Sequence, residues 1–132
     1  MRAVLDTNVI IAAFAARGLC SEVFGVCIEG HDIVLSDAIL RESQEKLLEK
    51  VVLPKAVVRD IIAYLRDTSE IVRPEPVEAE ACRDKDDLLI IGTALSGKSE
   101  VMITGDEDLL SLKKYRDVEI INPREFWRRL KG

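Results

Sequence analysis

Acidic side chains stand at four separate places in this sequence, each where a short apolar run ends or where a helix is expected to begin. Carboxylate oxygens are the ligands that hard divalent cations such as Mg²⁺ and Mn²⁺ take in proteins. A cation held in this way lowers the pKa of a water molecule and stabilises the charge that develops on a phosphoryl group under attack. The chemistry to test for is therefore metal-dependent hydrolysis of a phosphate ester. The acids in question are Asp6, Glu42, the group Asp84, Asp86 and Asp87, and Asp106.

The order of apolar runs and helical patterns predicts the elements that must position these acids. Strands are expected at residues 3–5, 33–35, 71–72, 101–104 and 118–121, and helices at residues 8–16, 19–29, 36–51, 54–67, 88–95, 108–114 and from residue 122 to the end. Ser36 is the expected N-cap of the third helix, and Asn122-Pro123-Arg124-Glu125 has the spacing of a capping box. From the apolar run alone, residues 88–95 fit a buried strand as well as a helix. Strands that alternate with helices predict one domain, residues 1–132, folded as a three-layer α/β/α sandwich with a mostly parallel central sheet.

Ligands of such folds bind beyond the carboxyl ends of the strands, which is where these acids fall. Each acid taken alone has a simpler explanation. Asp6 and Asp106 have the position of helix N-caps, and Asp84 fits best as the cap of the 88–95 helix. Glu42 alone fits an exposed helix residue. If the acids converge, their mutual repulsion exceeds what helix dipoles, worth about 0.3–1 kcal/mol each, offset. A hard cation resolves that repulsion, so convergence favours a metal site.

The net charge of −5 argues against a nucleic-acid partner, because proteins that bind nucleic acids usually carry a basic excess. A metal bound among the acids would offset part of that charge. Basic residues do gather late in the chain, which indicates either a solvated helix face or contact with an RNA backbone. These residues are Lys113, Lys114, Arg116, Arg124, Arg128, Arg129 and Lys131.

Cysteine and histidine usage argues against other metal chemistry. The three cysteines lack CxxC spacing and His31 is the only histidine, so neither a zinc site nor a histidine general base is expected. Cys20 and Cys27 stand seven residues apart, on one helix face, and are expected in the core. No apolar stretch reaches the roughly 20 residues of a membrane span, and the N-terminus leads straight into a strand rather than a secretory signal. A soluble, cytoplasmic protein without membrane contacts is expected.

Five segments resemble, in order and spacing, the motifs of the PIN-domain family. They are Leu5-Asp6-Thr7-Asn8, Ser36 to Glu42, Cys82 to Asp87 with the helix that ends at Thr93-Ala94, Thr104 to Leu110, and Asn122 to Phe126. The last segment is similar to the closing segment of a prokaryotic, VapC-like branch of toxin–antitoxin PIN proteins. The resemblance covers nearly the whole chain.

The resemblance implies a metal-dependent ribonuclease that hydrolyses RNA phosphodiesters with metal-activated water. It implies that Asp6, Glu42, Asp87 and Asp106 hold Mg²⁺ or Mn²⁺, with Asp87 chosen over Asp86 because of its distance from Thr93-Ala94. Asp6 and Asp106 are then expected to contact the metal most directly, and Glu42 and Asp87 to complete the site, one of them through water or as a proton acceptor. Supporting roles fall to Asn8, Asp84, Thr104 and Asp108. The implied partners are the RNA substrate, a small antitoxin protein and a second copy in a homodimer.

Three other functions compete with this interpretation. Gly92 to Ser99 formally matches the P-loop pattern, but that loop needs a helix after it, and here a strand-like run follows at once. A Mg²⁺-dependent phosphohydrolase with an aspartate nucleophile usually has a second aspartate two residues after the first, where this chain has Asn8. A PIN-fold protein that has lost catalysis and serves as a binding module is the third, and the four retained acids argue against it.

Overall fold

The computed structural model describes residues 1–131, and Gly132 lies outside the described residues. Within them the strands form one sheet of six in the order β3-β2-β1-β4-β6-β5. The strands are β1 (Arg2–Leu5), β2 (Asp32–Leu35), β3 (Glu70–Ile71), β4 (Val101–Ile103), β5 (Lys114–Tyr115) and β6 (Val118–Ile121). The helices are α1 (Thr7–Ala15), α2 (Leu19–Gly30), α3 (Asp37–Glu49), α4 (Lys55–Thr68), the 3₁₀ turn η1 (Ala79–Ala81), α5 (Lys85–Ser96), α6 (Glu107–Leu110) and α7 (Pro123–Lys131).

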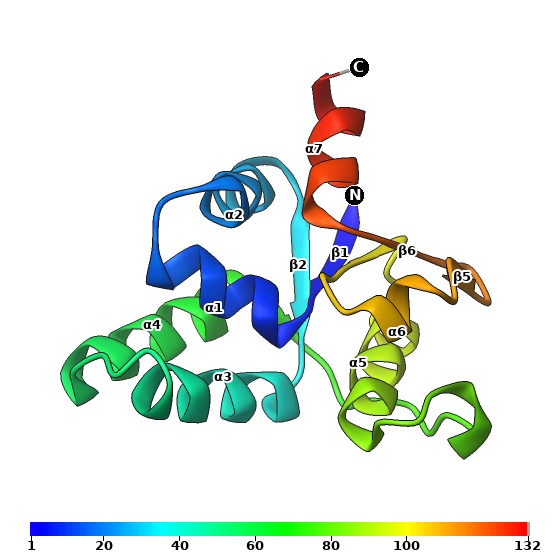
Figure 1. Ribbon diagram of the computed structural model, residues 1–132, viewed down its shortest axis with the longest axis horizontal. Helices are drawn as coiled ribbons and strands as arrows, with labels where there is room; N and C mark the ends of the chain where they lie inside the picture. The colour runs from blue at the N-terminus through cyan, green and yellow to red at the C-terminus, as the bar shows by residue number, and fades with distance from the viewer. Residues whose placement is uncertain (132) are drawn as a thin grey trace.

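Helices cover the sheet on both faces, so the predicted three-layer α/β/α fold is confirmed. Helix α5 contacts β1, β2 and β4, whereas α2 contacts β2 and α7. Figure 1 shows α2 and α5 on opposite sides of the central strands. The strand pairs are parallel except β5–β6. The central strands are short continuous apolar runs because both of their faces are buried: residues 3–5 and 101–103 are at most 3% exposed.

Two predicted helix starts are present, and they fix where α3 and α7 begin. The Ser36 hydroxyl accepts a hydrogen bond from the Ile39 N–H at 3.4 Å and caps α3. The Asn122 side chain accepts from the Glu125 N–H at 2.8 Å. The Glu125 carboxylate accepts from the Arg129 guanidinium at 3.0 Å, so this residue serves an ion pair one turn further along the helix.

The region after β4 differs from the prediction. The expected helix over residues 108–114 ends at Leu110, and Lys114 and Tyr115 form strand β5, which pairs with β6 in an antiparallel hairpin. Lys113 and Arg116 flank that strand with φ values of 62° and 52°, a backbone conformation that a helix does not allow. The leucine spacing indicated a helix, but the backbone pairing with β6 determines the structure there.

The glycines of the P-loop pattern lie in and after a helix that packs closely on its neighbours. Residues 85–96 are helical, which settles the helix-or-strand question for the 88–95 run, and Gly97 is the C-cap, as predicted. A Cβ on Gly92 would clash with the Glu75 carbonyl, and one on Gly97 would clash with Val34. Glu100 directly precedes β4, where a P-loop requires a helix. Close packing therefore explains these glycines.

Within residues 1–131, none of the individual helices combines the length and the hydropathy needed to cross a membrane. Helices α1 and α2 meet that test only as a pair, and they are bent by 105° relative to each other.

Candidate functional site

The sheet order brings together the residues that follow three strands far apart in the sequence. Strand β1 lies between β2 and β4, and all three run in the same direction. The chain therefore leaves them at one edge of the sheet, at Ser36, Asp6 and Thr104. Helix α5 leads back toward the start of β4, so its first turn lies at this edge too. We call the edge with Asp6, Glu42, Asp87 and Asp106 the acid edge.

Asp6 is a buried carboxylate whose partner is a side chain of the neighbouring strand. It is 4% exposed, and its Oδ2 accepts a hydrogen bond of 2.6 Å from the Thr104 hydroxyl. Although Asp6 has the N-cap position of α1, its side chain makes no capping hydrogen bond in the part of the chain described. Burial raises the pKa of Asp6, and the charges of Asp106 and Glu42 raise it further against the lowering effect of the Thr104 and Thr7 hydrogen bonds. The predicted cap explanation therefore does not account for this residue.

Asp106 is tied to Asp6 through the same threonine. Its backbone N–H donates to the Thr104 hydroxyl oxygen at 3.0 Å. Its Oδ1 accepts from the N–H groups of Asp108 at 2.8 Å and Leu109 at 3.2 Å, so Asp106 also caps α6. Thr104 thus fixes both aspartates at once, and the simpler cap explanation holds for one oxygen of Asp106.

Asp87 lies in the first turn of α5 among several other carboxylates. It is 7% exposed. Burial is the main cause that raises its pKa to about 7, followed by the negative charges of Asp106, Asp84, Asp6 and Asp108. Repulsion of this kind shows that the acids from β1, α5 and α6 act on one another.

Of the other two aspartates in this group, Asp84 caps α5. Its Oδ1 accepts from the Asp86 N–H at 2.8 Å, as the simpler explanation predicted. Asp86 is exposed and lines a groove of about 220 Å³ between α3 and α5, together with Glu42. The structure thus buries Asp87 and leaves Asp86 and Asp84 at the surface.

Glu42 reaches the acid edge from α3 and has a cation beside it. The Lys46 ammonium lies 3.7 Å from the Glu42 carboxylate, one helix turn away, and donates to the Asn8 side-chain oxygen at 3.3 Å. Glu42 is close enough to Asp6 for its charge to raise the pKa of Asp6. Asn8 thus lies at the edge of the site, in contact with the lysine.

A buried pair of hydroxyls holds α3 against α5. The Thr93 and Ser36 hydroxyl oxygens lie 2.9 Å apart in a hydrogen bond, and both side chains are buried. This bond joins the N-cap of α3, the helix that carries Glu42, to α5, the helix that carries Asp87.

Sequence reasoning missed Lys46, Cys82 and the Ser36–Thr93 bond. The spacing of Lys46 from Glu42, four residues along one helix, was the available signal. Cys82 lies near the acids. Burial raises the pKa of its thiol, and the charges of Asp87, Asp106, Asp108 and Asp84 raise it further. Its place follows from the fold of the 74–84 segment, which carries no strong sequence pattern.

The side chains at the acid edge fit a hard divalent cation by their chemistry. The donors are carboxylate oxygens, the ligands that such a cation takes, and two of them, Asp6 and Asp87, are buried. Within residues 1–131, no three His, Cys, Asp or Glu side chains are close enough to ligate one ion. The assignment of the four acids as ligands stays a prediction.

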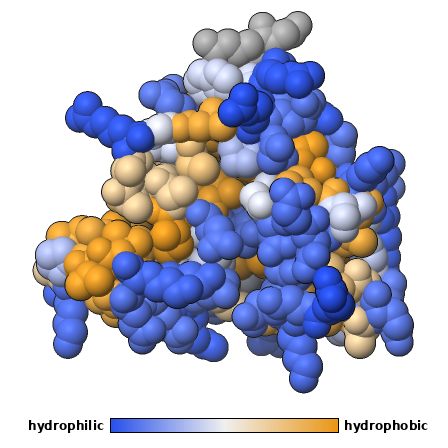
Figure 2. Space-filling view, viewed as in Figure 1, coloured by the Kyte–Doolittle hydropathy of each residue, from blue (hydrophilic) through white to orange (hydrophobic). Residues whose placement is uncertain are grey.

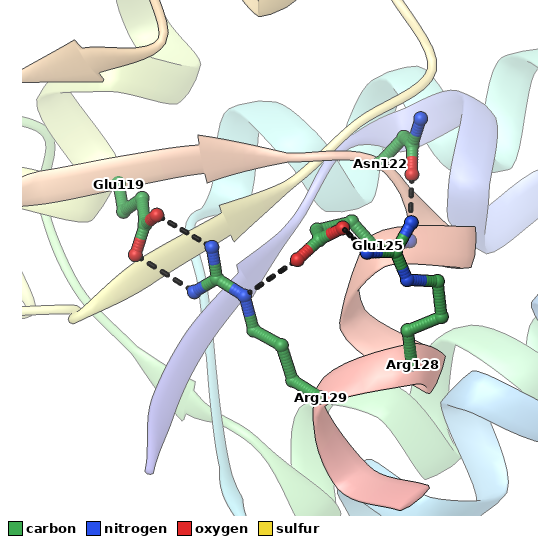
Figure 3. A network of polar contacts seen from close by, with 5 residues as sticks. All are labelled: Glu119, Asn122, Glu125, Arg128 and Arg129. Carbon is green, nitrogen blue, oxygen red and sulfur yellow. Dashed lines mark hydrogen bonds and ion pairs between the residues drawn. The ribbon is translucent and has the colours of Figure 1, made fainter. Parts of the chain in front are cut away.

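Three of the basic residues late in the chain, Arg116, Arg128 and Arg129, form ion pairs with glutamates. The Arg129 guanidinium donates to both oxygens of Glu119, at 2.8 and 2.6 Å, and to Glu125 at 3.0 Å. Arg128 pairs with Glu125 at 3.6 Å, and Figure 3 shows these side chains together with Asn122 on β6 and α7. Arg116 pairs with Glu78 at 3.7 Å. The side chain of Lys131 is outside the described part. Arg128 and Arg129 thus form ion pairs on the face of α7, and contact of the late basic residues with an RNA backbone stays a prediction.

Comparison with known proteins identifies the family and the fold. A family model described as PIN domain matches residues 2–108. The structure is similar to that of VapBC2 from Rickettsia felis bound to a DNA fragment from its promoter, with TM-score 0.63, 16% identity, and coverage of 92% of this chain and 98% of the other. It is also similar to VapBC-1 from nontypeable Haemophilus influenzae, with TM-score 0.62, 18% identity, and coverage of 94% and 99%. Among curated proteins, none matches the sequence.

Proposed function

Because the chain belongs to the PIN domain family, we propose that it is a metal-dependent ribonuclease and that residues 1–132 make up a single nuclease domain. The observation that carries the proposal is the acid edge itself. Asp6 and Asp87 are buried there, and besides burial the charge of Asp106 raises the pKa of both, that of Asp87 to about 7. Burying carboxylates near one another costs free energy, and a role as helix caps does not require it. The burial of Asp6 and Asp87 near Asp106 therefore supports a functional site.

The proposed ligands of a Mg²⁺ or Mn²⁺ ion are Asp6, Glu42, Asp87 and Asp106. When bound, such a cation lowers the pKa of an attacking water and stabilises the charge on the phosphoryl oxygens. The chain's own residues do the rest. Thr104 orients Asp6 by its hydroxyl hydrogen bond and holds Asp106 by its acceptor oxygen. Asp87, whose carboxyl pKa burial raises to about 7, is the proposed acceptor of a proton from water.

The experiment that tests this proposal is an RNA cleavage assay with labelled single-stranded RNA in Mg²⁺ or Mn²⁺. Cleavage is expected with either metal and is expected to stop when a chelator is added. Cleavage that persists in the chelator contradicts the mechanism. Release of phosphate from small phosphoesters without RNA cleavage identifies a phosphohydrolase, and metal binding without turnover identifies a silent binding module.

An exposed apolar surface supports a protein partner, for which we propose a small antitoxin. The rings of Phe14 and Phe24 lie 5.1 Å apart and those of Phe24 and Tyr64 lie 6.4 Å apart, joining α1, α2 and α4. Beside them Val57 and Tyr64 are each 43% exposed. Figure 2 shows apolar side chains gathered at the lower left, where α1 and α4 lie in Figure 1. Both structural neighbours are VapBC proteins, which supports the same proposal.

Expression in bacteria tests the toxin part of the proposal. The parent chain is expected to arrest growth, and an Asp6→Asn variant at the same protein level is expected not to. Normal growth with the parent protein contradicts a toxin role. It does not affect the nuclease proposal, which the RNA cleavage assay tests separately. Homodimer formation stays a prediction, tested by the molar mass of the purified chain in solution.

A further inference from the structure

We propose that single-stranded RNA crosses the acid edge between Lys46 and Arg83, and that these two cations bind backbone phosphates on either side of the cleaved bond. The inference rests on the proposed ribonuclease function and adds the path of the substrate. It starts from a conflict in charge: the chain carries a net charge of −5, and its carboxylates repel a polyanion. Cations next to the acids are therefore needed to bring the phosphates in.

Lys46 marks one end of this path. It contacts residues of two helices at once, the Glu42 carboxylate at 3.7 Å and the Asn8 side-chain oxygen at 3.3 Å. Its side chain is 27% exposed, so it is held at the border between the acids and solvent. An ammonium group fixed by two oxygens at the rim of a site is placed to bind a phosphate oxygen as a point charge.

Arg83 marks the other end. It precedes α5, its side chain is 90% exposed, and its guanidinium lies 3.7 Å from the Asp108 carboxylate, which is itself 59% exposed. An ion pair as exposed as this one contributes roughly 0–1 kcal/mol, so a phosphate readily displaces it. Asp108 also donates its backbone N–H to Asp106, which places Arg83 next to the acid edge.

The sheet topology puts the acids between these two cations. Lys46 and Glu42 belong to the helix that follows β2, Asp6 follows β1, and Asp106 and Asp108 follow β4. Since the strands lie in the order β2-β1-β4, α3 with Lys46 begins on one side of Asp6, and Asp108, which Arg83 contacts, follows the strand on the other side. Neighbouring strands are about 4.8 Å apart, so β2 and β4 are separated by about 10 Å. An extended RNA strand that spans this edge presents more than one phosphate to it.

The test is RNA binding measured against salt concentration. A labelled single-stranded RNA is titrated by fluorescence anisotropy, without added divalent metal, with the Asp6→Asn protein, which is expected to be unable to cleave it. On this background Lys46→Gln and Arg83→Gln are each expected to reduce the slope of log K against log salt by about 0.7, and the double variant by about 1.4. From a 1 M reference, one such contact corresponds to about fivefold weaker binding at 0.1 M salt.

Two control variants separate phosphate binding from structural effects. Arg59→Gln removes an exposed cation on α4, where Arg59 pairs only with its neighbour Asp60 among the residues described. It is expected to leave the slope unchanged. Lys46→Arg keeps the charge and is expected to keep the slope, whereas a purely structural role for Lys46 would be disturbed by either substitution.

Slopes equal to that of the background in both Lys46→Gln and Arg83→Gln overturn the inference. A slope change of the same size in Arg59→Gln also overturns it, because the effect would then be one of net charge. The outcome is distinct from failure of the proposed function, which is decided by whether the parent protein cleaves RNA at all.

Discussion

Two groups of charged side chains around the same sheet have opposite electrostatics. On β6 and α7, Arg129 lies between Glu119 and Glu125, and its hydrogen bonds lower the pKa of Glu119 (Figure 3). At the acid edge, burial and neighbouring carboxylates raise the pKa of Asp87 to about 7. The carboxylates of the first group are paired with arginine, whereas in the second only Glu42 has a cation beside it, and Asp6, Asp87 and Asp106 form no ion pair within residues 1–131.

This difference separates a structural group from a functional one. Paired surface charges contribute modestly to stability, and they do not need a ligand to neutralise them. Carboxylates kept close together and desolvated cost stability, and proteins retain such arrangements where a function needs them. The comparison predicts that substitutions at the acid edge change activity, and that substitutions in the α7 network change only stability.

The largest expected effect follows from Asp6→Asn. The amide keeps the size of the side chain and the Thr104 contact but removes a charged metal ligand. RNA cleavage is expected to fall at least about 100-fold, the usual cost of removing one group that stabilises charge in a transition state. The thermal midpoint of the metal-free protein should not fall, because a buried charge is removed. Glu119→Gln, the matched control in the α7 network, should cleave at the parent rate, and an equal loss in both variants would erase the distinction.

A smaller loss is expected for Thr104→Val. The variant removes the donor to Asp6 and the acceptor for the Asp106 N–H, but keeps the shape of the side chain. Groups that orient metal ligands are typically worth about 10- to 100-fold in metal affinity or activity. The measurement is cleavage rate against Mg²⁺ concentration, with Thr104→Ser, which retains the hydroxyl, as the control. Parent-like metal dependence in the valine variant contradicts the role of Thr104.

The pH dependence of stability also distinguishes the acid edge from the α7 network. The pKa of Asp87 is about 7 in the folded protein against 3.8 for an unperturbed aspartate, so between these pH values the folded state holds a proton that the unfolded state has released. Stability of the metal-free protein therefore falls as pH rises from about 4 to about 7, by at most about 1.4 kcal/mol per pH unit. Asp87→Asn should remove this component in urea titrations repeated across that range, and Mg²⁺ should reduce it in the parent. A parent-like pH slope in Asp87→Asn contradicts the account.

The smallest effect is expected in the α7 network. Arg129→Gln removes the ion pairs to Glu119 and Glu125, which are partly exposed, so the free energy of unfolding is expected to fall by about 1 kcal/mol or less. RNA cleavage should be unchanged. Loss of cleavage in a folded Arg129→Gln protein would mean that the late basic residues take part in function after all.

The sequence predicted the fold because each strand is a short apolar run and most helices begin at recognisable caps. Ser36 and Asn122 mark two of those starts, and both caps are present. The prediction was wrong after residue 110. The leucine pattern indicated a helix there, but residues 114–115 form a strand that pairs with β6. Pairing between strands depends on tertiary structure, which residue patterns do not record.

For the candidate site, the sequence identified the acids but not their environment. That Asp87 is buried and Asp86 exposed follows from the rotation of α5, which the family resemblance indicated and the residues alone left open. The threonine that links Asp6 with Asp106 was expected only as a supporting residue, and Lys46 was not expected. Contacts between elements far apart in the sequence decide such details.

The most direct test of the account is a crystal structure of the protein grown with Mn²⁺, with the metal located by anomalous scattering. The account predicts an anomalous peak at the acid edge, ligated by the carboxylates of Asp6 and Asp106, and its loss in Asp6→Asn. A Mn²⁺-saturated crystal with no peak there, or with its peak at Glu119 and Glu125 instead, contradicts the central claim that the acid edge is a metal centre.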